Sequence, residues 1–315
     1  RSRGSAEELV EAGIDALLAS GVTCVHAMSV GSKELDALAK LAESGRLRVR
    51  VRAYLDPSVP DPRPLTAGNL RVIGLKVFAD GSFGARTAAL REAYSDDPGN
   101  SGMLLMDRDA IAKALEEAKR RGLQLAVHAI GDRALEEVAK AVERVGGWLR
   151  VEHASLAPPD LIEALAELKI PVAAQPRFII SDWWIVSRLG ERARWAYPFR
   201  SFLSTGVALA FSSDAPVEPC NPWEGVYAAA TRGSLEDLPA ARLWAIEAIS
   251  VEDAVRCYTE TASNIVGERL GKLSPGYPAD FVVLDRNPFE LLQSQLRSVK
   301  VLATFLGGVE VFRRT

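Results

Sequence analysis

This chain of 315 residues carries a formal net charge of −3, and 25% of its residues are charged. The slight acidity argues against a nucleic-acid-binding protein, which would usually show a basic face. The lack of an 18-residue apolar run argues against a membrane span. Three cysteines lie far apart without a CxxC motif, so we expect a reducing, cytoplasmic compartment rather than a disulfide framework.

Segments typical of helices and strands alternate along the chain. Ser5 and Glu8 form a capping-box pattern, which predicts a helix almost at once. The apolar patterns predict, in order, helix 5–20, strand 22–28, helix 33–44, strands 49–55 and 73–80, helix 107–121, strand 123–130, helix 132–145, strand 148–155, helix 158–168, strand 170–175, helix 197–204 and strand 207–214. Such alternation indicates an α/β fold with parallel strands and helical crossovers.

Seven strands of this series are predicted to be parallel, and eight would close a (β/α)₈ TIM barrel. Because the chain opens directly on a helix, we expect the first barrel strand to be missing and the sequence to be a fragment. Two short helices after residue 251 precede strands at 280–284 and 299–311, the latter broken by a hairpin turn at Gly307 and Gly308. We therefore expect a barrel at residues 1–265 and a small β domain at residues 266–315.

Four of the predicted strands carry, near their carboxyl ends, a residue that can bind a metal ion: Lys76, His128, His153 and Asp214. Charged or coordinating groups rarely occupy apolar strands unless they are paired, bound to metal or catalytic. In a barrel the carboxyl ends of the strands meet on one face, which is where catalytic groups lie. We therefore expect these four side chains to converge.

More than one role is possible for each of these residues. A desolvated Lys76 would have a lowered pKa, and its neutral amine could form a Schiff base or capture CO₂ as a carbamate that bridges two cations; alternatively it reaches the rim. Neutral His128 and His153 suit zinc-like ions, although a strand histidine is often a hydrogen-bonded core residue. Asp214 could bind metal and act as a general base, or cap the following turn.

Two connections, at residues 81–106 and 177–202, are too long for simple loops. Long loops at the carboxyl face of a barrel usually hold function. We predict that Arg86 in the first loop and Trp183 and Trp184 in the second bind substrate, the tryptophans through an apolar or aromatic substituent. The alternatives are an ion pair between Arg86 and a neighbouring acid, and a surface insertion with its own aromatic core.

Four motifs together resemble the amidohydrolase superfamily: KVFADGS at residues 76–82, HAIGDRA at 128–134, EHA at 152–154 and SDAP at 213–216. The closer similarity is to its family 3 branch, which includes N-substituted formamide deformylases. Segment 276–285 is similar to that superfamily's return to a small β-sandwich, so the resemblance implies that residues 266–315 are the C-terminal part of one. It also implies a TIM-barrel, metal-dependent hydrolase that cleaves a non-peptide, amide-like carbon–nitrogen bond by attack of a metal-activated hydroxide.

The resemblance also implies a role for each candidate. Lys76 would be carboxylated and bridge two divalent cations, expected to be zinc, and His128 and His153 would hold the second cation. Asp214 would bind the first cation, orient the hydroxide and pass its proton to the leaving amine. The His-x-His motif that the family places on its first strand is absent from this chain, and His26 stands alone. The first cation therefore lacks two ligands, which leaves the activity of this chain open.

Two other functions stay open at this point. One is a Schiff-base aldolase or lyase that uses Lys76, and the other is a truncated, inactive barrel fragment. The expected partner of an active chain is a small-molecule amide-like substrate, with no nucleic acid and no membrane. The sequence fixes neither the substrate nor whether the chain forms a homo-oligomer.

Overall fold

The computed structural model describes residues 4–315, so the first three residues of the predicted barrel region lie outside it. Its main sheet contains seven parallel strands in the order β1-β2-β4-β5-β6-β7-β8, as predicted. These are β1 (Cys24–Val30), β2 (Arg50–Leu55), β4 (Leu70–Phe78), β5 (Gln124–Ala129), β6 (Leu149–His153), β7 (Val172–Ala174) and β8 (Leu209–Phe211). Neither end strand pairs with the other among residues 4–315.

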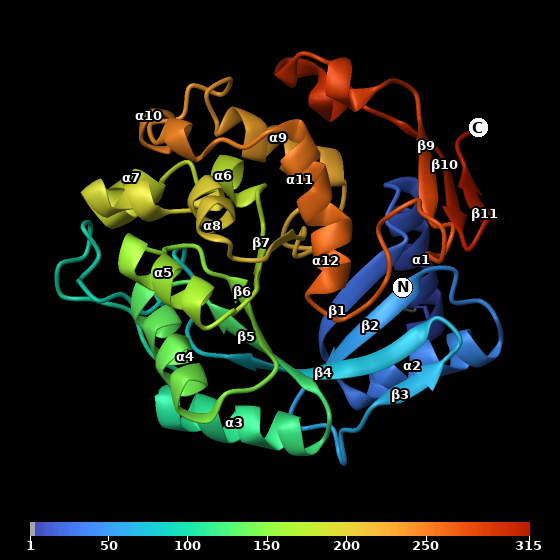
Figure 1. Cartoon of the computed structure of the whole chain (residues 1–315), viewed down its shortest axis with the longest axis horizontal. Coiled ribbons are helices and arrows are strands. Elements are labelled where there is room, and N and C mark those ends of the chain that lie inside the picture. The colour runs from blue at the N-terminus through green and yellow to red at the C-terminus, as the bar shows by residue number, and fades with distance from the viewer. Residues whose placement is uncertain (1–3) are drawn as a thin grey trace.

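Helices cover the outside of this curled sheet (Figure 1). The capping box predicted from the sequence is present, because Ser5 Oγ accepts from the Glu8 N–H and Glu8 Oε2 accepts from the Ser5 N–H. The predicted helices are α1 (Ala6–Ala19), α2 (Ser32–Glu43), α3 (Arg108–Arg120), α4 (Asp132–Val145), α5 (Pro159–Glu167), α8 (Phe199–Thr205), α11 (Val251–Tyr258) and α12 (Glu260–Asn264). The α/β fold class is thus confirmed.

The alternation of side chains gives the sheet two different faces. The outward side chains of β8, such as Leu209 and Phe211, join the large core under the helices. Near its centre the inward face carries apolar side chains, several of them alanines, which pack on the segment after α12. This inner cluster consists of Tyr54, Ile73, Ala126, Ala173, Ala210, Ile265 and Val266. On β4, Leu75 and Val77 belong to the outer core, so the alternation points Lys76 inward, and on β5 His128 shares the inner face with Ala126.

Several elements were not predicted. Strand β3 (Leu65–Ala67) pairs antiparallel with β4 and is too short to show a period. Before the predicted helix α8, the connection from residue 177 was expected to be a loop, but it contains three short helices: α6 (Phe178–Ser181), α7 (Ile185–Leu189) and η1 (Gly190–Trp195). Helix α9 (Pro222–Thr231) is buried on nearly every side, so its sequence lacks an amphipathic stripe. Short helices α10 (Ala241–Trp244), η2 (Ala245–Glu247), η3 (Pro288–Glu290) and η4 (Gln293–Ser298) complete the set.

A small antiparallel sheet follows the parallel one. It consists of β9 (Phe281–Leu284), β10 (Val301–Leu306) and β11 (Val309–Arg313), in the order β11-β10-β9. Gly307 and Gly308 form the predicted hairpin turn, and both have the positive φ that such a turn requires. The sheet lies beside α1, where Thr304 Oγ1 donates to the Leu18 carbonyl at 2.7 Å (Figure 1).

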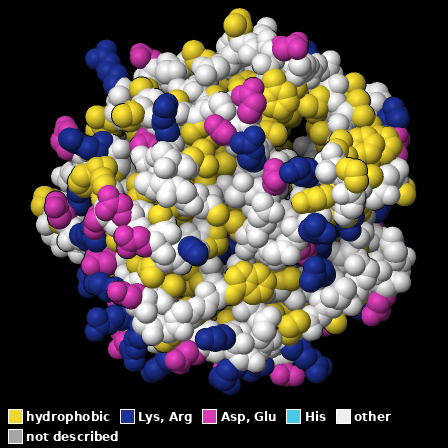
Figure 2. Space-filling model, viewed as in Figure 1, with side chains coloured by type: hydrophobic (Ala, Val, Ile, Leu, Met, Phe, Trp, Pro, Cys, Tyr) yellow, Lys and Arg dark blue, Asp and Glu magenta, His cyan; other side chains and the backbone are white. Residues whose placement is uncertain are grey.

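The molecular surface agrees with the near-neutral charge of the chain. On the face seen in Figure 2, basic and acidic side chains are interspersed with apolar ones and form no continuous region of one sign. Across residues 4–315, every helix is too short or too polar to cross a membrane.

Candidate metal centre at the carboxyl end of the sheet

Three of the four predicted ligands lie on adjacent strands of the parallel sheet. Lys76 lies on β4, His128 on β5 and His153 at the end of β6. In the register of these strands Phe78 is opposite His128, and Ala129 is opposite His153. The two imidazole rings consequently meet edge to face, with their centroids 4.4 Å apart. Lys76, His128 and His153 thus lie toward the carboxyl ends of their strands, and their role as ligands stays a prediction.

Lys76 is a buried amine without a hydrogen-bond partner. The residue is 4% exposed, and its Nζ contacts no acceptor within hydrogen-bond distance. Nζ lies 4.6 Å from the centroid of the Phe78 ring. Burial lowers the pKa of Lys76 to about 8, although the carboxylates of Glu152 and Asp214 oppose this effect. About one tenth of the Lys76 side chains are therefore neutral amines at pH 7, and the neutral form predominates above pH 8.

His128 is held in one tautomer. Its Nε2 lies 2.9 Å from the Gly81 carbonyl oxygen, which can only accept, so Nε2 carries the proton. The Asp80 carboxylate lies 3.5 Å from the same nitrogen. Burial, assisted by the charge of Lys76, lowers the pKa of His128 to about 4. The imidazole is therefore neutral at pH 7, and its Nδ1 keeps a lone pair.

His153 is deeper than His128. Its Nδ1 lies 2.7 Å from Gln175 Oε1, and its ring stacks on Phe178 at a centroid distance of 6.3 Å. Burial holds the pKa of His153 well below its usual range, and the neighbouring His128 and Lys76 lower it further. The backbone of His153 is left-handed, with φ of 78°, at the last residue of β6.

Asp214 follows β8 and lies closer to solvent. Its backbone is also left-handed, with φ of 57°, and the residue is exposed. Partial burial of the carboxyl group raises its pKa to about 6, while the charge of Lys76 opposes the shift, so the two groups lie within electrostatic range. Because the residue keeps access to water, this shift is discounted as a measure of energy. Within residues 4–315, no three His, Cys, Asp or Glu side chains lie close enough to hold a metal ion.

Two residues of this site were not predicted as functional. Asp80 is 1% exposed, and its carboxylate accepts from three backbone N–H groups, those of Ala89, Ile130 and Gly131. Gln175 is 3% exposed and directly follows β7. Both are polar residues on the inward face just past the end of a strand, which is the signal that identified Lys76 and His128. Their partners are distant in sequence, so the pattern gave no indication of what they contact.

The predicted substrate-binding residues lie on two connections that touch each other. Arg86 forms a two-point ion pair with Asp96, with N–O distances of 3.1 and 3.0 Å. Trp183 is 60% exposed, whereas the ring of Trp184 packs 5.2 Å from the guanidinium carbon of Arg188. The Arg86 alternative, an ion pair with a neighbouring acid, is thus present, and substrate binding by the three residues stays a prediction.

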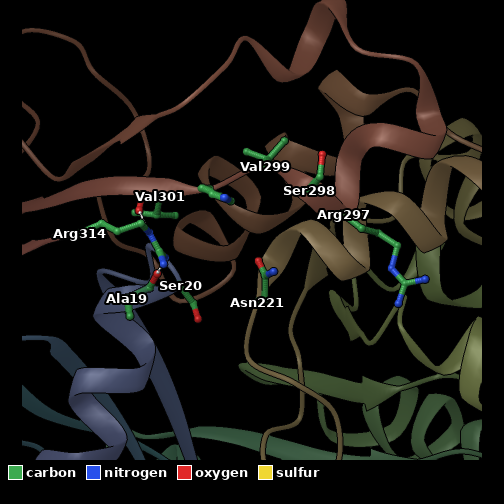
Figure 3. Close-up of a pocket in the computed structure, with 9 residues that line it drawn as sticks. Ala19, Ser20, Asn221, Arg297, Ser298, Val299, Val301 and Arg314 are labelled. Atoms are coloured by element: carbon green, nitrogen blue, oxygen red, sulfur yellow. Dashed lines mark hydrogen bonds between the residues drawn. The ribbon is translucent and has the colours of Figure 1, made fainter.

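A separate cavity lies away from this centre. It has a volume of about 330 Å³ and is open between α1, the start of α9 and η4 (Figure 3). Its lining residues are Ala19, Ser20, Asn221, Arg297, Ser298, Val299, Lys300, Val301 and Arg314. None of the predicted ligands belongs to this lining, so the cavity gives no information about the candidate centre.

Comparison with known proteins gives consistent matches. A model of the amidohydrolase family matches residues 3–312. The "Putative amidohydrolase YtcJ" of Bacillus subtilis (strain 168) is 35% identical over 249 residues, which are 76% of this chain and 47% of that protein. The N-substituted formamide deformylase of Arthrobacter pascens is 28% identical over 258 residues, which are 78% of this chain and 46% of that protein. The chain thus spans about half the length of the curated relatives it matches.

A solved structure agrees with these sequence matches. The crystal structure of an uncharacterized metal-dependent hydrolase from Pyrococcus horikoshii OT3 has a TM-score of 0.88 to this chain at 39% sequence identity. The match covers 92% of this chain and 61% of that one. The parallel sheet and the small antiparallel sheet are therefore arranged as in a known protein.

Proposed function

This chain belongs to the amidohydrolase family, in its family 3 branch, and from that premise we propose that it carries the catalytic barrel of a metal-dependent hydrolase. The bond it would cleave is a non-peptide, amide-like carbon–nitrogen bond. The observation that carries the proposal is the amine of Lys76, which is buried without a hydrogen-bond partner next to two neutral imidazoles. A buried polar atom without a partner lowers the stability of the fold, so its presence calls for an explanation such as a functional role.

The chemistry of these side chains fits a divalent cation. The Nδ1 of His128 and the Nε2 of His153 keep lone pairs, because the other nitrogen of each ring contacts Gly81 or Gln175. Asp214 would supply a carboxylate oxygen, and Lys76, once its neutral amine has captured CO₂, would supply two more. A bound cation, zinc by this proposal, would lower the pKa of water and polarise the carbonyl group of the substrate.

The protein's own groups would then move the proton. With a pKa raised to about 6, Asp214 is ionised at neutral pH yet basic enough to accept a proton from the attacking water. Asp214 also keeps access to solvent, and by this proposal the same carboxyl group would deliver the proton to the leaving nitrogen. His128 and His153 stay neutral throughout, since burial opposes their protonation.

The first test is metal content combined with activity. We expect zinc to bind the chain and Lys76→Ala to remove zinc and hydrolysis of N-benzylformamide together. Lys113→Ala, at an exposed lysine on α3, is the matched control and should change neither. Hydrolysis that persists in metal-free protein would refute the proposal.

A second readout separates the hydrolase from a Schiff-base enzyme. The pKa of about 8 also suits Lys76 as a nucleophile toward a carbonyl group. Treatment with borohydride in the presence of a carbonyl compound would then add the mass of the reduced adduct at Lys76. We expect no adduct in zinc-loaded protein, and an adduct at Lys76 would favour the aldolase or lyase.

A further inference from the structure

Gln175 links the candidate centre to two other strands. Its side chain is buried at the end of β7 and makes three hydrogen bonds. Nε2 donates to the Ala173 carbonyl at 3.1 Å and to Ser212 Oγ at 2.9 Å, and Oε1 lies 2.7 Å from His153 Nδ1. The side chain therefore joins β6, β7 and the segment after β8.

The orientation of this amide group follows from its partners. The Ala173 carbonyl oxygen can only accept, so the nitrogen of the amide must face it. Rotating the amide by 180° would place two oxygens against each other and lose both donated bonds. Oε1 is consequently fixed toward His153, and since an oxygen of this kind only accepts, His153 must carry its proton on Nδ1.

We propose that Gln175 is a positioning residue that sets the tautomer of His153, leaving Nε2 free for the cation, and that ties His153 to the segment carrying Asp214. This inference rests on the proposed function, because it assumes that His153 binds the cation. Ser212, the second partner of the amide, precedes Asp214 by two residues. One side chain thereby orients a ligand on β6 and restrains the loop that presents the carboxylate.

The surroundings of His153 do not fix its tautomer without Gln175. The ring is flanked by His128 on one side and by Phe178 on the other, at centroid distances of 4.4 and 6.3 Å. These contacts restrict the plane of the ring but bind neither nitrogen. Loss of the amide would leave Nδ1 buried and unpaired, so the proton would be free to occupy Nε2 and block metal binding.

The test compares Gln175→Leu with Gln175→Glu and with the matched control Gln124→Leu. Gln124 is also a buried inner-face glutamine that makes a side-chain contact to Tyr54 and donates to the Ile265 carbonyl, but it contacts neither histidine. Zinc affinity is measured by chelator competition. We expect Gln175→Leu to weaken zinc binding about 10- to 100-fold. Gln175→Glu keeps the acceptor for Nδ1 but loses the bond donated to the Ala173 carbonyl, so it should weaken zinc binding less than Gln175→Leu does. Gln124→Leu should leave zinc affinity unchanged.

A metal-free readout keeps this inference distinct from the proposed function. Nitrogen chemical shifts of His153 should show Nδ1 protonated in the wild-type chain and a mixture of tautomers in Gln175→Leu. A proton on Nε2 in the wild type, or wild-type zinc affinity in Gln175→Leu, would overturn the role of Gln175. If no variant binds zinc, the proposed function fails while the shifts still decide the tautomer. Should Gln175→Leu not fold, Ser212→Ala, which removes one of the two bonds that the amide nitrogen donates, should weaken zinc binding in the same direction but by less.

Discussion

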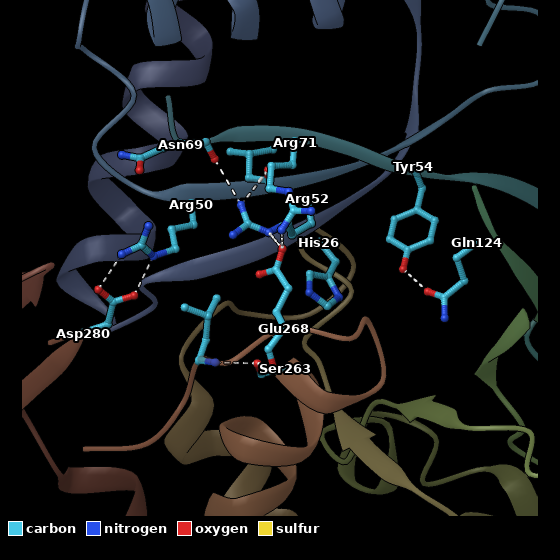
Figure 4. Close-up of polar contacts among 12 residues, drawn as sticks. His26, Arg50, Arg52, Tyr54, Asn69, Arg71, Gln124, Ser263, Glu268 and Asp280 are labelled. Atoms are coloured by element: carbon cyan, nitrogen blue, oxygen red, sulfur yellow. Dashed lines mark hydrogen bonds and ion pairs between the residues drawn. The ribbon is translucent and has the colours of Figure 1, made fainter. Parts of the chain in front are cut away.

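The two ends of the inner face of the parallel sheet differ in whether their buried cationic side chains have partners. Toward the amino ends of the strands, Arg50 and Arg52 both have acidic partners. Arg52 donates to Glu268 at 2.6 Å and to the backbone carbonyls of Val51 and Asn69 (Figure 4). Arg50 pairs with Asp280 through two bonds of 2.7 and 3.0 Å. These pairs join β2 to the segment after α12 and to the start of the small sheet.

Between the two ends lies a second paired layer. Arg150 donates to both carboxylate oxygens of Glu152, at 2.5 and 3.1 Å, and its NH1 lies 2.7 Å from His26 Nδ1. Since a guanidinium only donates, His26 must accept at Nδ1 and is neutral. The same guanidinium packs over the Tyr54 ring at 4.8 Å. His26 thus acts as a hydrogen-bond acceptor for Arg150 inside the sheet, which is a structural role.

At the carboxyl end the pattern is reversed, because Lys76 keeps an amine with no acceptor and each candidate histidine keeps a free nitrogen. Both ends cost desolvation energy, yet only the amino end recovers it through partners inside the protein. The comparison indicates that the paired charges stabilise the arrangement of the two sheets, whereas the unpaired amine of Lys76 destabilises the fold. Substitutions at the two ends should consequently change stability in opposite directions.

Breaking the pair between Arg52 and Glu268 should have the largest effect. Both side chains are almost completely buried, at 6% and 8% exposure. Arg52→Met leaves the Glu268 carboxylate buried with only the half-exposed Arg71 as its remaining partner. We expect a loss of about 3–5 kcal/mol in the free energy of unfolding, measured by denaturant titration. Zinc affinity should stay at the wild-type value, because the pair lies away from the candidate ligands.

Two controls sharpen this prediction. Replacing both partners, as Arg52→Met with Glu268→Leu, should recover most of the lost stability, because no buried charge then lacks a partner. Arg71→Met removes the other cation near Glu268. Because the Arg71 side chain is 44% exposed, we expect the free energy of unfolding to fall by less than about 1 kcal/mol. A single Arg52→Met variant as stable as wild type would show that this end does not depend on its ion pairs.

Lys76→Met should act in the opposite direction in metal-free protein. The folded chain holds the pKa of Lys76 at about 8, below the 10.5 of an exposed lysine, so protonated Lys76 destabilises the fold. The penalty is complete below pH 8 and disappears as the pH rises toward 10.5, because the unfolded chain then also loses its proton. At pH 7 we expect Lys76→Met to be about 2–4 kcal/mol more stable than wild type, with the difference shrinking between pH 8 and 10.5.

The pH series provides the control for this prediction. A packing effect of methionine would be the same at every pH, whereas relief of a buried charge depends on pH as described. Denaturant titrations of both chains at pH 7, 9 and 10.5 separate the two causes. If the wild type and Lys76→Met were equally stable at pH 7, the amine would have a partner in solution, and the contrast between the two ends would be wrong.

The fold was predictable where its periodicity was local. The strands that carry Lys76 and His128 alternate between apolar outward residues and inward functional ones, and that pattern needs no knowledge of distant contacts. Helix α9 was missed because burial on nearly every side removes the polar stripe that marks a helix. The helices within residues 177–202 were missed because each is only one or two turns long.

The site was predictable in its composition but not in its support. Lysine and histidine are rare within apolar strands, so Lys76, His128 and His153 can be identified as candidates from the sequence alone. The contacts of Gln175 and Asp80 depend on strand register and on residues up to 51 positions away, which no local pattern contains. The strand arginines Arg50 and Arg52 were equally obscure, since their acids follow more than 200 residues later.

Arg86→Met should have the smallest effect on stability and tests the rim of the unpaired end. Its ion pair with Asp96 is solvent-accessible, with side-chain exposures of 34% and 23%, so its loss should barely change the free energy of unfolding. If Arg86 binds substrate, the KM for N-benzylformamide should rise about tenfold, in line with the loss of a charged hydrogen bond. Asp96→Asn weakens the same ion pair but keeps the guanidinium, and should leave KM near the wild-type value. Equal KM values for both variants and wild type would show that Arg86 only supports the loop structure. Substrate contacts at the carboxyl end of the sheet would then come from residues other than Arg86.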